Sequence, residues 1–158
     1  MSTRRESRER VMQALYAFEL GSGDAEHVMK TLLQETLSDD KPALQFAETL
    51  FLRTLDRSEE TDAIIGSHTQ NWELSRIALV DRLILRMALC EMMSFEDIPP
   101  KVSINEAIEV AKKYSTNRSG QFVNGILDAA LESLTKDGKM QKEGRGLIGM
   151  STPPEGSE

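Results

Sequence analysis

The sequence predicts an all-α protein, and three observations lead to that prediction. Apolar residues recur at helical spacing through most of the chain, so that each segment has one apolar face. Glycines, prolines and capping residues interrupt these segments at intervals typical of helix ends. No segment shows the strict alternation of apolar and polar residues that marks a half-buried strand. We therefore expect at least half of the residues in helices and no sheet of three or more strands.

The first half of the chain divides into four expected helices. The first carries apolar residues at helical spacing and ends at residues 21–23, which contain two glycines. Asp24 can cap the second, because its carboxylate accepts hydrogen bonds from the free N–H groups of a first turn. Pro42 suits the first turn of the third, where a missing N–H leaves no hydrogen bond unmade. The fourth begins at Ser58 and ends near Gly66 or a few residues beyond it.

The strongest helical pattern runs from about Arg76 to Ser94, after Trp72. Its apolar residues cover most of the helix circumference, which is typical of the buried centre of a helical bundle. The pair Pro99-Pro100 ends this unit. The segment 103–106 then fits a capping box, in which a serine and a glutamate satisfy each other's backbone N–H groups.

The last helix is expected to follow a loop at residues 115–120 and to carry Phe122. Gly125 lies inside this helix, where it costs roughly 1 kcal/mol relative to alanine. Such a glycine usually marks the close approach of another backbone or of a ligand. Glycine, serine, proline and lysine dominate the end of the sequence. We therefore expect residues 138–158 to form a disordered tail that adds nothing to the core.

A chain of 158 residues fits one compact domain, which we place at residues 1–137. The single cysteine, Cys90, excludes an internal disulfide and indicates a reducing compartment. The first ten residues hold four arginines and no apolar run, so we expect no signal peptide. The most apolar stretch, residues 77–95, is interrupted by four charged side chains and is not expected to span a membrane. The expected location is the cytoplasm.

Signatures of enzymes and metal sites are missing from the sequence. His27 and His68 are far apart in sequence, and neither has a cysteine or a second histidine at ligand spacing. Neither common type of glycine-rich phosphate-binding loop occurs. Cys90 lies on an apolar helix with no histidine near it in sequence, which favours a core cysteine over a nucleophile. We therefore expect no catalytic residue, no metal and no cofactor.

A basic N-terminal segment is the first positive sign of function. The net charge is −7, but residues 1–10 carry four arginines and two glutamates, a local charge of +2. Arg4 and Arg8 lie one helical turn apart with Arg5 beside them, and arginine binds phosphate through paired hydrogen bonds. Tyr16 follows on the same helix and could stack on a base. The alternatives are solvated arginines at a frayed terminus and a core tyrosine with a wet hydroxyl.

Four groups of motifs occur along the chain from about residue 4 to residue 134. In order, they are Arg4-Arg5 with Arg8-Glu9 and Gln13-Ala14-Leu15-Tyr16; Trp72 with Arg76–Arg82 and Ile84–Ala88; Ile98-Pro99, Lys101-Val102 and Ile104–Glu109; and Phe122–Leu127. Together they resemble the NusB family of bacterial transcription antitermination factors. Each motif alone is modest, but four groups in the family's order and spacing are highly specific.

The resemblance implies a NusB-like fold of two stacked helical subdomains, each a bundle of three to four helices, at about residues 4–68 and 72–136. It also implies binding of the boxA sequence in nascent ribosomal RNA together with NusE, a small-subunit ribosomal protein. With RNA polymerase, this assembly would read through Rho-dependent terminators. The RNA contacts that the resemblance implies are Arg4, Arg5, Arg8, Gln13, Tyr16, Gln121 and Phe122. The implied contact for NusE is Asp81.

One departure from the family's pattern adds a residue to this set. Family members usually have an acidic pair just before the serine of the last loop, whereas this chain has Asn117-Arg118. The loss of negative charge beside an RNA surface should strengthen the attraction of phosphates. We therefore include Arg118 among the predicted RNA contacts.

Two other functions remain open. One RNA cytosine methyltransferase has an N-terminal domain that resembles the NusB family, but it also needs a cofactor-binding α/β domain, and only about twenty polar residues follow the helices here. A helical protein-interaction module without RNA binding would explain the arginines as a solvated face. The sequence also leaves open whether the free protein is a monomer or a homodimer that masks its RNA surface.

Overall fold

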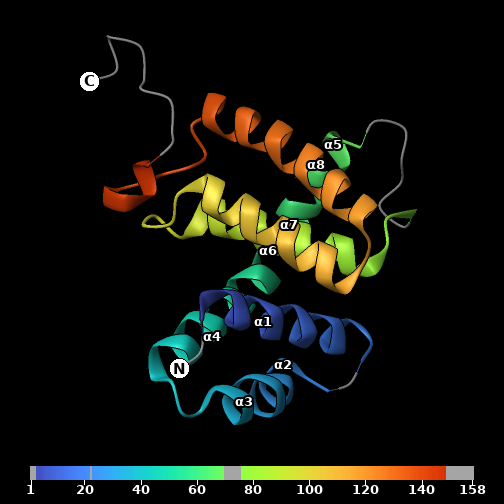
Figure 1. The fold of residues 1–158 in the computed structure, drawn as a ribbon, viewed down its shortest axis with the longest axis vertical. Helices are drawn as coiled ribbons and strands as arrows, with labels where there is room; N and C mark the ends of the chain where they lie inside the picture. The colour runs from blue at the N-terminus through green and yellow to red at the C-terminus, as the bar shows by residue number, and fades with distance from the viewer. Residues whose placement is uncertain (1–2, 22, 70–75, 149–158) are drawn as a thin grey trace.

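The computed structural model describes residues 3–21, 23–69 and 76–148, and every regular element in these ranges is a helix (Figure 1). The elements are α1 (Arg4–Glu19), α2 (Ala25–Val28), the π-helical turn η1 (Met29–Gln34), α3 (Glu35–Leu37), α4 (Lys41–Asp56), α5 (Ser58–Ser67), α6 (Leu79–Ser94), α7 (Pro100–Tyr114), α8 (Asn117–Lys136) and the 3-10 helix η3 (Gly144–Leu147). The all-α prediction is confirmed. In the described ranges no helix is both long enough and apolar enough to cross a bilayer.

The N-terminal helices begin at side chains that satisfy free backbone N–H groups. Thr3 accepts a hydrogen bond from the N–H of Glu6, and the Glu6 carboxylate accepts one from the N–H of Thr3, so a capping box begins α1. Asp24 caps α2 as predicted, and Asp40 caps α4. Pro42 stands in the first turn of α4, also as predicted.

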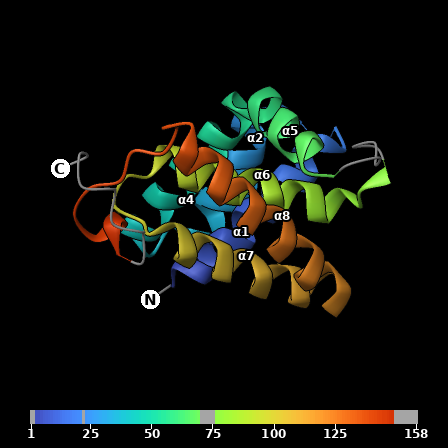
Figure 2. The ribbon, with the colours of Figure 1, turned by 90° about the horizontal axis from the view of Figure 1, so that it is seen from above.

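The helix α6 lies at the centre of the molecule. It packs against α1 and α4 from the N-terminal half and against α5, α7 and α8 (Figures 1 and 2). Leu85, Leu89 and Met92 on this helix are completely buried. The prediction of a buried central helix is therefore confirmed, although α6 begins at Leu79 because the backbone of Ala78 is not helical, with ψ at 138°.

The other helices form two groups around α6. In the N-terminal group α1 packs against η1 and α4, whereas α7 and α8 pack along each other in the C-terminal group. Figure 1 shows the N-terminal group below α6 and α8 above it. The helix α5 contacts α6 and α8 as well as α4. The predicted subdomain boundary near residues 68–72 stays a prediction, since residues 70–75 lie outside the described part of the chain.

The predicted capping box at residues 103–106 is wrong. The helix α7 begins earlier, at Pro100, because a proline suits a first turn and Pro99 before it is extended. Ser103 is therefore inside the helix, and its hydroxyl donates to the Glu91 carboxylate at 2.8 Å.

The predicted loop before the last helix is shorter than expected. The Thr116 hydroxyl accepts a hydrogen bond from the N–H of Ser119 and caps α8, which begins at Asn117. Residues 117–120 therefore belong to the helix rather than to the loop. The consequence for function is that the side chains of residues 117–122 have fixed helical positions.

The prediction of a tail without core contacts is wrong for residues 138–148. The Lys142 ammonium is buried and donates to the backbone carbonyls of Glu91 and Phe95, at 3.2 and 2.7 Å. These carbonyls lie at the C-terminal end of α6, the negative end of the helix dipole, which attracts a cation. Burial lowers the pKa of Lys142. Residues 149–158 lie outside the described part of the chain.

Candidate nucleic-acid interface

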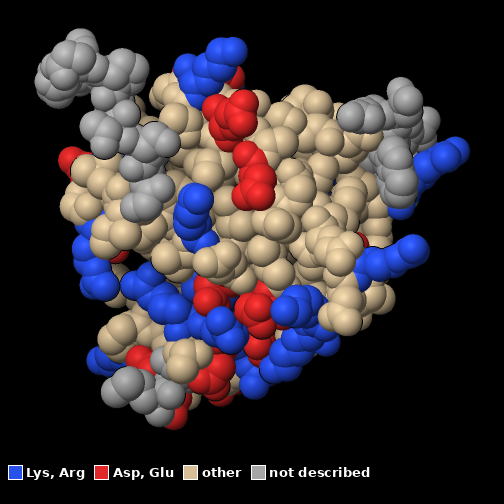
Figure 3. All heavy atoms as spheres, turned by 45° about the horizontal axis from the view of Figure 1, so that its top comes forward, with Lys and Arg blue, Asp and Glu red and all other residues tan. Residues whose placement is uncertain are grey.

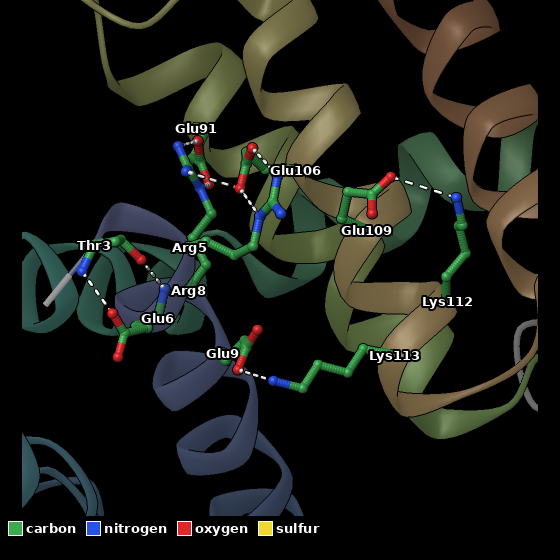
Figure 4. Close-up of polar contacts among 10 residues, drawn as sticks. All are labelled: Thr3, Arg5, Glu6, Arg8, Glu9, Glu91, Glu106, Glu109, Lys112 and Lys113. Carbon is green, nitrogen blue, oxygen red and sulfur yellow. Dashed lines mark hydrogen bonds and ion pairs between the residues drawn. The ribbon is translucent and has the colours of Figure 1, made fainter.

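The helices α1 and α7 lie side by side, and ion pairs join them (Figure 4). The Arg5 guanidinium donates to both carboxylate oxygens of Glu106, at 2.8 and 2.9 Å. About one turn further along α1, Glu9 accepts a hydrogen bond from the Lys113 ammonium at 2.9 Å. Hydrogen bonding to Arg5 lowers the pKa of the Glu106 carboxyl, and hydrogen bonding to Glu9 raises the pKa of Lys113. Both cations therefore stay charged and are held at the surface.

Tyr114 connects the same two helices. Its hydroxyl donates to Glu9 at 3.0 Å and accepts a hydrogen bond from the Gln13 amide at 3.2 Å. Burial is the first cause of a raised pKa for Tyr114, and the hydrogen bond to Glu9 adds to it. Tyr16 is 39% exposed, so it is not a core tyrosine. Gln13 and Tyr16 therefore lie on the α1 part of this surface.

Arg4 is exposed at the start of α1. Its guanidinium carbon lies 4.1 Å from the centroid of the Phe46 ring, a cation–π contact. Within the described ranges Arg4 makes no ion pair with a carboxylate. The ring holds one face of the guanidinium, and the N–H groups at its edge remain able to bind a phosphate.

Arg8 is not on this surface. The residue is 4% exposed, and its guanidinium donates to both carboxylate oxygens of Glu91, at 2.8 and 2.7 Å. Burial alone would lower the pKa of Arg8, but the hydrogen bonds and charge of Glu91 outweigh it and leave the pKa raised. Arg8 therefore joins α1 to α6 inside the protein. In this arrangement its guanidinium cannot meet a phosphate.

The start of α8 holds the remaining predicted RNA contacts. Arg118 and Gln121 are exposed, and Phe122 is half-buried against the core. Gln121 and Lys112 of α7 line the same shallow hollow. No atom approaches the Cβ position of Gly125, so the expectation of a neighbouring backbone is wrong and a ligand remains the alternative.

Asp81 is inside the protein, between α6 and α8. It is 7% exposed, and its Oδ2 accepts a hydrogen bond from the Ser119 hydroxyl at 2.9 Å. This carboxylate therefore helps to fix the start of α8. The side chain is not an exposed surface charge, and a contact between Asp81 and NusE stays a prediction.

Sequence reasoning missed the α7 half of the interface. Lys112-Lys113-Tyr114 is a basic pair followed by an aromatic residue, a combination of residue types that also occurs in the N-terminal segment. The local spacing predicts a capping box for Glu106, whereas the structure pairs it with Arg5, 101 positions away in the sequence. A contact over that separation leaves no local pattern in the sequence.

Basic side chains are prominent on one face of the molecule. In the lower half of Figure 3, lysine and arginine side chains lie close together with acidic side chains between them. Between α1 and α7, the ion pairs Arg5–Glu106 and Lys113–Glu9 likewise place a carboxylate beside a cation. Three or more side chains placed to bind a metal ion occur nowhere in the described ranges.

The profile of the NusB family matches residues 5–132. This chain belongs to the NusB family. A Salinibacter ruber relative named Transcription antitermination protein NusB is 54% identical over 152 residues, which cover 96% of this chain and 95% of the relative. A Bacillus mycoides NusB is 43% identical over 131 residues, 83% of this chain and 98% of the relative. The predicted family is confirmed, as is the prediction that this NusB-family protein is not an enzyme.

Solved NusB structures have the same fold. The T. maritima NusB superposes with a TM-score of 0.76 at 38% identity, over 83% of this chain and 92% of that one. A second match is to a structure of antitermination factors NusB and NusE in complex with double-stranded RNA. Its TM-score is 0.75 at 26% identity, over 82% of this chain and 96% of that one.

Proposed function

We propose that this NusB-family protein is a transcription antitermination factor that binds boxA-type single-stranded RNA of nascent ribosomal transcripts together with NusE. In an assembly with RNA polymerase, the complex suppresses Rho-dependent termination. The protein then works in the cytoplasm, where bacterial transcripts are made. The observation that carries the proposal is the surface formed by α1, α7 and the start of α8, in a chain similar to a NusB solved with NusE and RNA.

The exposed cations of this surface can bind the phosphates of an RNA strand. Arg4 and Arg118 are exposed and make no ion pair within the described ranges, so their N–H groups are available. Arg5 uses two of its five N–H donors on Glu106, and its side chain is 50% exposed. Phosphate contacts of this kind position the strand and carry no sequence information.

Aromatic and amide side chains of the same surface can bind the bases. Tyr16 and Phe122 offer ring faces on which unstacked bases of a single strand can stack. Gln13 and Gln121 offer amide groups that both donate and accept hydrogen bonds, as base edges require. We propose that these four residues provide the preference for boxA-type RNA.

The two alternative functions are less well supported. The Salinibacter ruber relative is matched over 95% of its length and is named an antitermination protein, which favours that role over part of a methyltransferase. A protein-interaction module would not need cations that α7 and α1 hold toward solvent. Salt dependence separates it from an RNA-binding protein, because phosphate contacts weaken steeply as salt rises.

Binding of labelled boxA-type RNA and of scrambled RNA, each with and without NusE, tests the proposal. We expect tighter binding to boxA-type RNA, and a larger difference between the two RNAs when NusE is present. Equal binding to both RNAs under all conditions would contradict the proposed specificity. Sedimentation of the free protein, measured in parallel, reports whether a homodimer forms and whether RNA dissociates it.

A further inference from the structure

The segment that follows α8 is locked in place against the connection between α6 and α7. Lys142 donates to the carbonyls at the end of α6, and the N–H of Glu143 donates to the carbonyl oxygen of Glu96 at 3.0 Å. At Gly146 the two backbones are so close that an added Cβ would lie 1.9 Å from that same oxygen. Only glycine fits there, so the position of η3 is specified by the sequence.

This docking brings a third exposed arginine beside α1. Figures 1 and 2 show the segment, drawn in red, on the same side of the molecule as the start of α1. Arg145 of η3 lines one hollow together with Arg4 and Arg5. We call it the arginine hollow. The apolar residues Ile98, Pro99 and Val102 line it as well.

The charges of the arginine hollow favour an anion. Arg4, Arg5 and Arg145 are its exposed cations, whereas Arg8 at its inner wall is paired with the buried Glu91. Two carboxylates, Asp97 and Glu106, also line it, so the exposed arginines leave one positive charge in excess in a protein whose net charge is −7. Glu106, one of the carboxylates, already pairs with Arg5. Arg4 and Arg145 have no carboxylate partner within the described ranges. Two arginines from distant parts of the sequence therefore face one hollow with their N–H groups unoccupied by an acid.

We propose that the arginine hollow binds the phosphodiester backbone of RNA beyond the boxA-type core, with Arg145 as a phosphate contact. The proposal rests on the proposed RNA-binding function and extends it by one site. Guanidinium forks match the geometry of phosphate oxygens. The apolar side chains beside them can contact a sugar or base of the same nucleotide. The C-terminal segment thereby lengthens the path of the RNA across α1.

Arg145→Ala in the full chain tests the proposal, with a boxA-type RNA and the same RNA extended by several nucleotides on each side. We expect affinity for the extended RNA to fall on the order of tenfold at low salt, as for one charge-assisted hydrogen bond. Between about 50 and 200 mM salt, the ratio of parent to variant affinity should shrink roughly 2.6-fold, the effect of losing one phosphate contact from single-stranded RNA. Affinity for the short RNA should change little.

Lys139→Ala is the matched control, because it removes the same charge from the same segment outside the arginine hollow. A loss as large as that of Arg145→Ala would show a non-specific charge effect and overturn the proposal. Gly146→Ala should displace the segment and reproduce the loss. A melting temperature for each variant verifies that the helical fold is intact.

Three further results would decide against the site. If the parent binds RNA but Arg145→Ala binds the extended RNA equally well at every salt concentration, the arginine hollow is not an RNA site, while the proposed function stands. If Arg145→Ala weakens only the binding of NusE in the absence of RNA, the hollow holds an acidic protein surface instead. If the parent binds no RNA, the proposed function fails as well.

Discussion

Arg8 and Glu91 form an ion pair inside the protein, where each charge depends on the other. Arg8→Ala should lower the free energy of unfolding by about 3–5 kcal/mol, because it leaves a buried carboxylate without its counter-charge. Urea denaturation measures this loss. Arg5→Ala removes a pair on the surface and should cost less than about 1 kcal/mol. Similar losses in the two variants would show that Arg8 has no special structural role.

The ion pair between Arg5 and Glu106 makes the free energy of unfolding depend on pH. The hydrogen bond with Arg5 lowers the pKa of the Glu106 carboxyl in the folded state below its value in the unfolded chain. The pair therefore stabilises the protein above the unfolded pKa of about 4.3, and this contribution is lost as pH falls through the folded pKa. Urea denaturation from pH 7 down to pH 3 should show a smaller decrease for Glu106→Gln than for the parent. Identical pH profiles for Glu106→Gln and the parent would show that the pair with Arg5 does not contribute to the pH dependence.

Variants at Asp81 distinguish a structural role of this residue from a role in binding NusE. Asp81→Lys should lower the free energy of unfolding by at least about 2 kcal/mol, because it buries an ammonium beside the Ser119 hydroxyl. Asp81→Asn keeps an oxygen that accepts from Ser119 and should cost less. Thermal denaturation of both variants, beside their affinities for NusE, tests this. A stable Asp81→Lys that loses only NusE binding would support the contact that the family resemblance implies.

Tyr16 is the residue at which base stacking can be measured without loss of the fold. Tyr16→Ala should weaken RNA binding by about 1–3 kcal/mol and leave its salt dependence nearly unchanged, because a stacked base contributes no ionic contact. Folding stability should change little, since the side chain is 39% exposed. Phe122→Ala needs a melting curve beside its affinity, because Phe122 also packs against the core. Unchanged RNA affinity in Tyr16→Ala would exclude stacking at this position.

At the scale of single elements, the N-terminal cap of α8 affects both folding stability and the proposed RNA interface. Thr116→Ala removes the hydrogen bond to the N–H of Ser119 and should cost about 1 kcal/mol of stability. It should also weaken RNA binding, because the first turn of α8 carries Arg118. Asp24→Ala is the control, since it removes the cap of α2, which carries none of the proposed contacts, at a similar cost. Equal RNA affinities in the two variants would mean that the order of this turn is irrelevant to binding.

The helices that the sequence predicts well are those with strong local signals. The apolar circumference of α6, the cap at Asp24 and the proline in the first turn of α4 each depend on a few neighbouring residues. The errors concern contacts made across the chain. Ser103 and Glu106 have the spacing of a capping box, but their partners are Glu91 and Arg5. Lys142 lies in a polar segment, and its burial depends on carbonyls 47 and 51 positions away.

The interface, too, could be predicted only where it depends on residues that are neighbours in the sequence. The sequence placed Arg4, Arg5 and Arg8 together, because residues at this spacing are neighbours on a helix. It did not indicate which of them faces solvent, since that depends on where α6 and α7 lie against α1. The structure therefore separates a buried Arg8 from the exposed Arg4 and Arg5. The family resemblance carries no information on that difference.

For the whole molecule, charge distribution matters more than total charge. The net charge of −7 would repel RNA if it were spread evenly over the surface. Salt screens such repulsion beyond about 10 Å at 0.1 M ionic strength, so that a local group of cations governs binding at contact distance. The cations of α1, α7 and α8 form such a group, and Glu9 and Glu106 hold two of them in place.

The number of phosphate contacts can be measured from the salt dependence of RNA affinity for the whole protein. Arg4→Ala with Arg5→Ala should reduce the slope of log affinity against log salt by about 1.4, since each lost contact with single-stranded RNA contributes about 0.7. The loss should be the same for boxA-type and scrambled RNA, because phosphates are alike in every sequence. Lys30→Ala with Lys136→Ala removes two equal charges away from the proposed contacts and should leave the slope unchanged. Equal slopes for the arginine variant and the parent would instead identify the N-terminal arginines as a solvated face.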